Sequence, residues 1–240
     1  IHLLPKDKFE MNEKVLNAVQ NSKVMVTEIS LDIPLSQQIE IAQEMFLPEK
    51  KTYEDYISGE EYAFVYQYML DSLSIKKRKI KRIIRIKPFF SSGLVLKEYY
   101  GKIKSFEIEL KKLAKKNGMK FGALETLEEQ LNLVNDMTLD EQFENIEEDI
   151  TSIHEFDKMV TCYLQEDLDC LKEMVFMKND ADDFVDVFLY ARNEKWIPII
   201  ESFILKDATF FAVGAGHLLG EKGVIMLLQN KGYTVTPVLK

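Results

Sequence analysis

The sequence lacks the features that mark a membrane span or a nucleic-acid-binding surface. It contains no run of about 18 or more apolar residues, which excludes a recognisable transmembrane helix. Acidic residues outnumber basic ones by 40 to 31, and the net charge of −9 disfavours nucleic acid as a partner. No secretion signal is visible. The chain opens with Ile1-His2 and no initiator methionine, so we expect that an upstream segment has been lost, and the missing signal does not identify the compartment.

Cysteine is nearly absent, with only Cys162 and Cys170. In one continuous helix their Cα atoms would lie roughly 12 Å apart, because each residue adds about 1.5 Å of rise. A disulfide requires Cα atoms within about 7 Å. A helix break near Gln165-Glu166 would let the two cysteines pair. The sequence leaves the pairing open, and two cysteines do not identify the compartment.

Apolar residues make up 46% of the 240 residues and charged residues 30%, as in a globular protein with a solvated surface. Short β-branched and apolar runs lie near both ends of the chain and near residue 120, while helix-like spacing dominates between them. We therefore predict an α/β (α+β) fold. Its mixed sheet is built from N- and C-terminal β-α-β units, and a large helical insertion or lid accompanies it.

This prediction treats 1–240 as a single domain with two parts. The core is expected at about 1–32, 118–130 and 207–240, and the helical lobe at about 33–117 and 131–206. Within the lobe, 139–164 is predicted as one long amphipathic helix. The chain is expected to end with a strand at 209–213, a helix, and a closing strand around 235–237.

A basic run occupies residues 76–87, where eight of twelve residues are Lys or Arg and four isoleucines are interleaved. One interpretation is a patch that contacts a membrane surface through anionic lipid, or another polyanion. The other, which we favour, is the solvated face of an amphipathic helix in an acidic protein. The sequence does not exclude either.

Histidine is scarce, and one of the three histidines follows a glycine-rich turn. Gly214-Ala215-Gly216 carries little side-chain bulk, so the backbone can turn sharply after the strand and present His217 at the carboxyl edge of the sheet. A Gly-x-Gly turn also suggests a nucleotide loop. The third glycine of that fingerprint would fall at Leu219, which argues against it. His154, within the predicted long helix, is interpreted as a surface or packing residue.

Four residues with metal-binding or acid–base chemistry fall at predicted strand ends: His2, Glu28, Glu125 and His217. If these strands share one sheet edge, two imidazoles and one or two carboxylates converge there. Two histidines and a carboxylate suit Zn, Mn, Co or Fe, and open coordination positions would let a bound water ionise near neutral pH. The alternative is that these residues only cap strands and helices.

The segment VGAGHLLGEKGVIMLLQNKGYTV, residues 213–235, resembles the hallmark of the TraB/GumN family, which includes PrgY and the animal TIKI proteases. That family carries two Gly-x-x-His motifs. The second corresponds to Gly214–His217, and only Ile1-His2 of the first is present. Further similarities are Lys87-Pro88-Phe89, the segment from Gly122 to Gln130, and Arg192-Asn193.

The resemblance implies a metal-dependent hydrolase, with peptidase activity in the animal members. The expected cofactor is a divalent metal ion, Mn, Co or Zn, and the expected partner is a peptide or protein substrate rather than nucleic acid. The implied fold is similar to that of the erythromycin esterase and ChaN proteins. Many members carry signal peptides, so we expect a secreted, periplasmic or lipid-anchored protein. The oligomeric state stays open.

The resemblance also suggests roles for individual residues. His2 and His217 are expected as metal ligands, Glu28 as third ligand or general base, and Glu125 as the other candidate base. Arg192 is expected to stabilise an oxyanion or orient a carboxylate, or else to form a salt bridge with the acidic helices. Asn193 would position Arg192 or cap the following helix.

The sequence also leaves two other functions open. One is a binding protein that sequesters a peptide in an apolar groove of the aromatic-rich helical block. The other is a metal-independent, esterase-like hydrolase with a histidine as general base.

Overall fold

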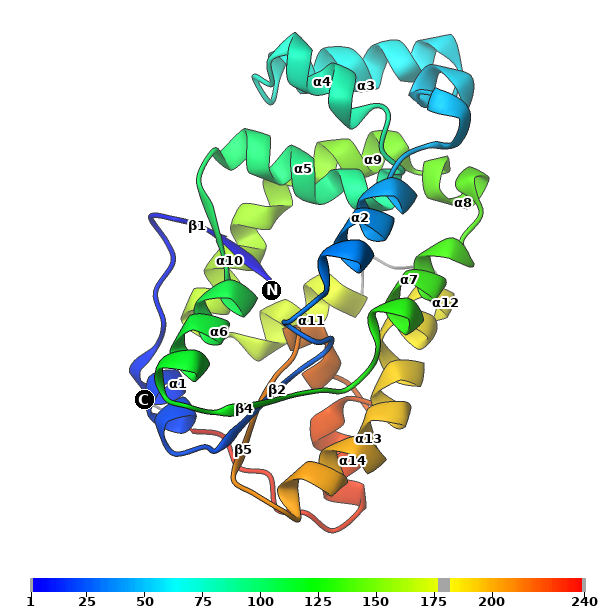
Figure 1. Ribbon diagram of the computed structural model, residues 1–240. Helices are drawn as coiled ribbons and strands as arrows, with labels where there is room; N and C mark the ends of the chain where they lie inside the picture. The colour runs from blue at the N-terminus through cyan, green and yellow to red at the C-terminus, as the bar shows by residue number, and fades with distance from the viewer. Residues whose placement is uncertain (1, 177–181, 239–240) are drawn as a thin grey trace. The chain divides into compact units, whose positions relative to one another are not determined.

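The computed structural model describes residues 2–176 and 182–238 and divides the chain into two compact units (Figure 1). The sheet unit comprises Ile1–Asp32, Lys104–Gln130 and Lys158–Lys240, and the helical unit comprises Ile33–Ile103 and Leu131–Asp157. Ile1 of the first expected motif lies outside the described residues. The expected core did not include 104–117 and 158–206. The structure groups both with the sheet, because helices from these ranges cover its faces.

A three-stranded parallel sheet lies at the centre of the sheet unit. Its strand order is β4 (Lys120–Ala123), β2 (Val24–Thr27), β5 (Thr209–Ala212). All four residues of β2 are buried, as expected for a central parallel strand covered on both faces. The predicted strands at these three places are confirmed within one or two residues.

The alternating side chains of β2 divide the packing between two helical layers. Met25 packs with α1 (Glu13–Gln20) and α6 (Phe106–Lys116) on one face. Val24 and Val26 pack with α13 (Ala191–Ile204) and α14 (Val224–Asn230) on the other (Figure 1). This period-2 alternation produces an α/β/α arrangement, and the predicted fold class is confirmed.

The ends of the chain depart from the predicted β-α-β units. β1 (Leu3–Pro5) lies in a separate two-stranded sheet with β3 (Ile103–Ser105) instead of joining the main sheet. The described residues after α14, up to residue 238, form no strand. The predicted closing strand at 235–237 is therefore wrong. Pro237 has no N–H for a ladder hydrogen bond, which makes this short run a poor strand.

The remaining elements of the sheet unit, or at its boundary, are helical: α7 (Leu127–Asn135), α10 (Phe156–Gln165), α11 (Leu168–Phe176), α12 (Asp182–Val185), the π-helix η4 (Asp186–Tyr190) and the 3-10 helix η5 (Ala215–Leu218). None of the helices in the residues that the structure describes is long and apolar enough to cross a bilayer.

The helical unit packs around its own apolar core, which includes Tyr53, Val65, Met69, Ile80 and Val95. Its elements are α2 (Leu35–Glu44), η1 (Pro48–Lys50), η2 (Tyr53–Asp55), α3 (Gly59–Asp71), α4 (Lys77–Ile83), α5 (Pro88–Tyr100), α8 (Leu139–Phe143), α9 (Ile146–Thr151) and η3 (Ser152–Glu155). The aromatic residues that suggested a peptide groove mostly pack in or against this core.

The predicted long helix at 139–164 is wrong, because the chain forms α8, α9, η3 and α10 there. Where α9 gives way to η3, hydroxyl side chains act as partners to helix carbonyls. Thr151 donates to the carbonyl of Glu147 at 3.0 Å and Ser152 to that of Asp149 at 3.0 Å. Between α10 and α11, Glu166 adopts a φ of 58°, which ends the first helix and reverses the chain.

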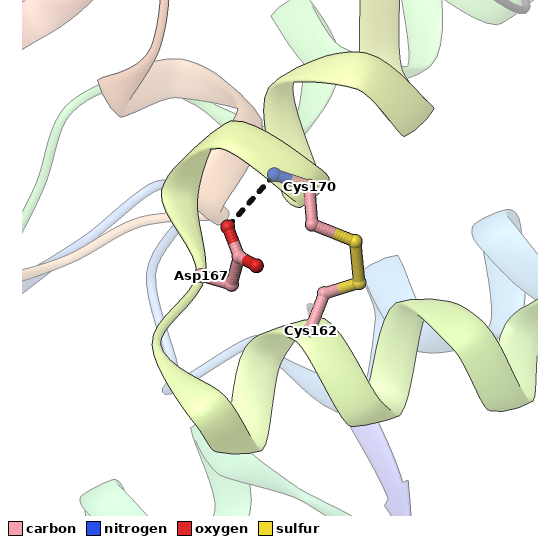
Figure 2. Close-up of a disulfide and its surroundings, with 3 residues drawn as sticks. All are labelled: Cys162, Asp167 and Cys170. Carbon is pink, nitrogen blue, oxygen red and sulfur yellow. Dashed lines mark hydrogen bonds between the residues drawn. A yellow bond between two sulfur atoms is a disulfide. The ribbon is translucent and has the colours of Figure 1, made fainter.

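This break lets the two cysteines pair, as the sequence allowed (Figure 2). Cys162 and Cys170 form a disulfide with Cα atoms 5.9 Å apart. Asp167 accepts a 2.9 Å hydrogen bond from the Cys170 N–H and so caps α11.

Candidate active site

The three strands of the main sheet end at one edge, where the candidate carboxylates lie. Thr27, the last residue of β2, pairs with Ala123 of β4 and Ala212 of β5. Glu28 follows β2 directly, and Glu125 follows β4 by two positions. The Glu125 N–H donates to the Glu28 carbonyl at 2.9 Å. The carboxyl ends of parallel strands thus bring these two predicted residues together.

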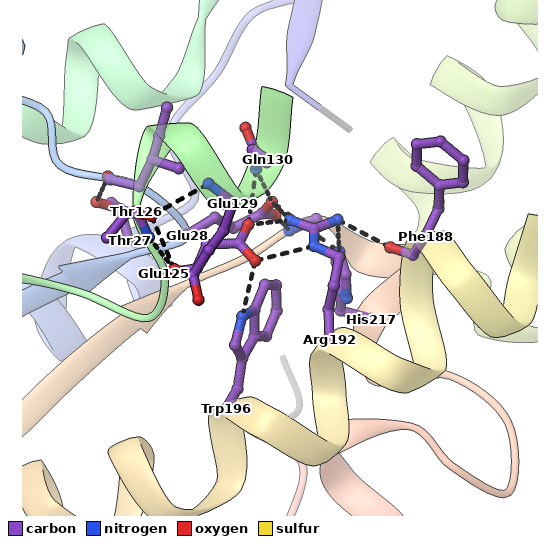
Figure 3. A network of polar contacts seen from close by, with 12 residues as sticks. Thr27, Glu28, Glu125, Thr126, Glu129, Gln130, Phe188, Arg192, Trp196 and His217 are labelled. Atoms are coloured by element: carbon purple, nitrogen blue, oxygen red, sulfur yellow. Dashed lines mark hydrogen bonds and ion pairs between the residues drawn. The ribbon is translucent and has the colours of Figure 1, made fainter. Parts of the chain in front are cut away.

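Glu28 connects β2 to the Gly214 turn, and it also pairs with Arg192, as Figure 3 shows. Its Oε1 accepts a 2.7 Å hydrogen bond from the Gly214 N–H, and its Oε2 accepts a 2.8 Å bond from Arg192 Nη2. Burial favours the neutral acid, but the positive charges and hydrogen-bond donors around it, Arg192 and the Gly214 N–H among them, outweigh it, and the pKa of this carboxyl lies below its usual value. Glu28 is therefore a carboxylate at neutral pH.

Glu125 receives hydrogen bonds at both carboxylate oxygens. Arg192 approaches it with Nη2 at 2.5 Å from Oε1 and Nε at 3.1 Å from Oε2. Gln130 donates to Oε1 at 2.9 Å, and the indole of Trp196 donates to Oε2 at 3.2 Å (Figure 3). The Glu125 side chain is only 7% exposed. With four donors around it, Glu125 holds Arg192 in place through charge-assisted hydrogen bonds.

Arg192 is the centre of this polar network. Besides the two carboxylates, its Nη1 donates to the Phe188 carbonyl at 2.8 Å and lies 3.1 Å from Nε2 of His217. The guanidinium also lies over the Trp196 ring, 4.9 Å from the centroid. Its carboxylate partners are Glu28 and Glu125 at the sheet edge. The alternative expectation, a salt bridge with the acidic helices, is not observed among the described residues.

His217 is buried and its ring orientation is fixed by Asn193. Asn193 Nδ2 donates to the carbonyls of His217 and Lys222 at 3.1 and 2.9 Å, so its Oδ1 is the acceptor for His217 Nδ1 at 2.7 Å. Nδ1 therefore carries the proton, and Nε2 presents a lone pair toward Arg192. The Trp196 ring packs on the imidazole with centroids 4.3 Å apart.

The imidazole of His217 is neutral at pH 7. Burial lowers its pKa, and although the Glu28 charge opposes this, Arg192 and His2 act in the same direction as burial. The pKa is about 4 as a result.

His2 reaches the same edge from the segment before β1. Its Nδ1 pairs with the Glu107 carboxylate, which also accepts a 2.5 Å hydrogen bond from the Ser105 hydroxyl. A Cβ placed on Gly214 would lie 3.3 Å from both His2 Nε2 and Glu28 Oε1. The glycine of the Gly-x-x-His turn therefore leaves room for these two side chains. The His2 side chain is 59% exposed, so solvent reaches it.

The four residues predicted to converge lie around one place, but not as a finished metal site. Among the residues that the structure describes, no group of three or more His, Cys, Asp or Glu is arranged to hold a metal ion. His217 Nε2 and Glu28 Oε2 are 3.9 Å apart, and Arg192 contacts both. The donor types and tautomers fit a divalent cation, since both imidazoles hold an oxygen partner at Nδ1. Binding there requires Arg192 to release these two atoms.

Several residues of the site were missed or misassigned by the sequence prediction. Asn193 was expected to position Arg192 or to cap a helix. Instead, its side chain bonds the ring and the backbone carbonyl of His217. Trp196 lies four positions after Arg192 on α13, a spacing that places both on one helix face and could have indicated it. Glu107 carried no signal, since its partner His2 is 105 positions away.

Comparisons with known proteins place the chain in a family. The model of the TraB/PrgY/gumN family matches residues 1–237. A protein of Amphimedon queenslandica described as a metalloprotease TIKI homolog is 37% identical over 54 residues. That match covers 21% of this chain and 11% of the relative's length. No solved structure matches the chain.

Proposed function

The chain belongs to the TraB/PrgY/gumN family, and on this basis we propose that it is a hydrolase that cleaves a peptide or peptide-like amide bond with a bound divalent metal ion. The partial similarity to a TIKI metalloprotease homolog supports the peptidase class. The matched segment is a small part of that protein, so the substrate and metal are proposals for this chain.

The observation that carries the proposal is the matched anchoring of two imidazoles beside one carboxylate. Glu107 holds Nδ1 of His2, and Asn193 holds Nδ1 of His217. In metal sites, an oxygen partner at one ring nitrogen fixes the tautomer and leaves the other nitrogen as ligand. Here both Nε2 atoms face the Glu28 carboxylate, and that of His217 becomes available once Arg192 releases it.

His2 and His217 would hold the ion, with Glu28 as third ligand or general base, and the family resemblance makes Mn, Co or Zn the expected metal. When bound, such a metal lowers the pKa of a coordinated water and polarises the scissile carbonyl. Of the two candidate bases, Glu125 has both oxygens held by Arg192, Gln130 and Trp196, so Glu28 is the better candidate to accept a proton where it is not a ligand. Its lowered pKa keeps it ionised for that role.

Arg192 would then serve the developing negative charge. Glu125 holds its Nε and Nη2, and Phe188 anchors Nη1, so the guanidinium would stay beside the site after it releases Glu28 and His217. A fixed cation in a water-poor site stabilises an oxyanion without reorganisation. Trp196 and Gln130 maintain the Glu125 carboxylate in that geometry.

We propose an extracytoplasmic location. The disulfide between Cys162 and Cys170 supports it, because such bonds persist in oxidising compartments and are rare in the cytosol. A peptide or protein met outside the cytoplasm would be the substrate.

Two other functions fit less well. A histidine acting alone as general base works best with a pKa near the working pH, whereas the pKa of His217 is about 4. A peptide-sequestering role has one supporting feature, a cavity of about 390 Å³ in the helical unit, lined by Phe46, Met137 and Leu139 among others. Most aromatic residues of that unit, however, pack in or against its core.

The test combines metal content with turnover. The purified protein and the variants His217→Ala and His2→Ala would be analysed for Mn, Co and Zn, then incubated with a peptide mixture with and without chelator. His154→Gln is the matched control, because His154 belongs to the helical unit and bonds Tyr99. We expect metal binding and cleavage in the wild type and the control, and loss of both in the two site variants.

Each rival function predicts a different result. Peptide bound and recovered intact in the presence of metal favours sequestration, and full cleavage in chelator favours metal-free chemistry. Either result, or a wild type that binds none of the three metals, contradicts the proposal.

A further inference from the structure

The helical unit carries a dense group of positive charges on one short helix. The basic run at 76–87 forms α4 and its flanks, packed against α3 and α5 (Figure 1). Six of its side chains are exposed and we call them the basic face: Lys76, Lys77, Arg78, Lys81, Arg82 and Arg85. The helix is about 10 Å long, because each of its seven residues adds about 1.5 Å.

The isoleucines of the run hold the basic face outward. Ile80, Ile83, Ile84 and Ile86 are all 6% exposed or less. Backbone hydrogen bonds fix the segment that follows α4: the Tyr53 N–H donates to the Ile84 carbonyl at 3.0 Å, and the Leu47 N–H to the Arg85 carbonyl at 2.9 Å. The apolar half of the helix is thus used in the core, and the polar half is a fixed surface.

Within the described residues, no carboxylate pairs with the basic face. Within the run, Lys79 pairs with Glu98 at 2.9 Å, and in the described part of the chain none of the six basic-face residues makes an ion pair. The run holds eight of the 31 basic residues and no acidic one, so the rest of the chain has 23 basic and 40 acidic residues. A strongly acidic protein therefore concentrates its positive charge at one place.

We propose that the basic face binds surfaces of anionic lipid headgroups. Sites for single-stranded nucleic acid add aromatic side chains on which bases stack, whereas the residues interleaved here are isoleucines, and they are buried. The acidic remainder of the chain also disfavours a long polyanion, which would extend past the patch. A headgroup layer requires only clustered charge, and because the isoleucines stay in the core the contact is peripheral.

The strength of such a contact follows from the number of charges. Each Lys or Arg near an anionic membrane contributes roughly a fivefold factor in affinity. Salt screens these charges within about 10 Å at 0.1 M ionic strength, so binding must weaken steeply as salt rises.

The experiment is sedimentation of the full chain with vesicles. One set contains phosphatidylcholine alone and the other about one quarter phosphatidylglycerol, each in about 0.05 M and about 0.5 M salt. The variant is K77E/R78E/K81E/R82E. The matched control, K116E/K120E/K195E/K206E, makes the same change in charge at exposed lysines of the sheet unit. Circular dichroism and thermal unfolding establish that both variants fold.

We expect the wild type and the control to bind only the vesicles with phosphatidylglycerol, and only in low salt. The basic-face variant should bind more than about 100-fold more weakly, since four contributions are removed and reversed. No binding of the wild type to these vesicles overturns the proposal. So does equal loss in the two variants, or wild-type binding to heparin or nucleic acid without binding to the vesicles.

Discussion

Asn193 contacts His217 at two points, with its Oδ1 2.7 Å from the ring Nδ1 and its Nδ2 3.1 Å from the backbone carbonyl. The same amide nitrogen donates to the Lys222 carbonyl at 2.9 Å. One fully buried side chain on α13 thus fixes both the tautomer of the imidazole and the path of the turn that carries it.

Asn193→Ala should therefore lower both stability and metal affinity. It leaves the buried carbonyl of His217 and the part-buried carbonyl of Lys222 without this donor, which costs about 1 to 3 kcal/mol in the free energy of unfolding. Loss of the Nδ1 partner should weaken metal binding by about 10- to 100-fold. Urea unfolding and metal titration measure the two effects. Unchanged metal affinity in the folded variant would show that Asn193 only supports the turn.

Glu107 offers a cleaner separation of the two effects, because its pair with His2 is half-exposed. Glu107→Ala should change the unfolding free energy by less than about 1 kcal/mol, yet lower metal affinity by about 10-fold through His2. Glu107→Gln keeps an acceptor for Nδ1 and should restore most of that affinity. If Ala and Gln at this position bind metal equally well, Glu107 does not orient His2.

Arg192 is the only cation seen to contact both Glu28 and Glu125 within the described residues. Arg192→Met should destabilise the fold by about 3 to 5 kcal/mol, since it leaves two buried carboxylates unpaired. Adding Glu125→Gln removes one of these charges and should recover part of the loss. Urea unfolding of the single and double variants measures this coupling. Additive losses would mean that the Glu125–Arg192 pair contributes nothing of its own.

Part of the site could be predicted because strand ends are readable from sequence. Short apolar runs located β2, β4 and β5, and parallel pairing then placed Glu28 and Glu125 together. The Gly-Ala-Gly turn likewise located His217. These inferences depend on local patterns and one general rule of sheet topology.

The partners of these residues could not be predicted, because they depend on packing between distant segments. Nothing near His2 indicates that Glu107 of α6 holds its ring. The insertion of Arg192 between the predicted ligands depends on how α13 packs against the sheet. The helix at 139–164 failed for a local reason, since Thr151 and Ser152 bond the backbone where amphipathic spacing continues.

The disulfide should stabilise the sheet unit. Cys162 and Cys170 close a short loop, and in the chain-entropy account a loop of this size contributes about 2 to 3 kcal/mol. A reductant should lower the unfolding free energy of the wild type by this amount. The double variant Cys162→Ala/Cys170→Ala should be destabilised similarly and should not respond to reductant. A wild type that unfolds identically with and without reductant contradicts the pairing.

Gly122 sets the distance between β4 and α13. A Cβ at this position would lie 2.5 Å from Cζ of Phe203 and 3.1 Å from Cγ2 of Val26. Gly122→Ala should therefore destabilise the fold by about 1 to 3 kcal/mol through overpacking. Gly93→Ala is the matched control, because Gly93 lies in α5 and a Cβ added there would meet no atom within 4 Å, so this change should stabilise by up to about 1 kcal/mol.

Gly122 also affects the site, because β4 and α13 each lead to or carry a site residue. β4 leads into Glu125 and α13 carries Arg192, so separating them lengthens the contacts between these side chains. Phe203→Leu removes the ring and should rescue the stability of Gly122→Ala in the double variant, as measured by urea unfolding. Metal affinity should recover with it. Failure of the rescue would mean that Gly122 is required for the backbone of β4 itself and not for the close approach of α13.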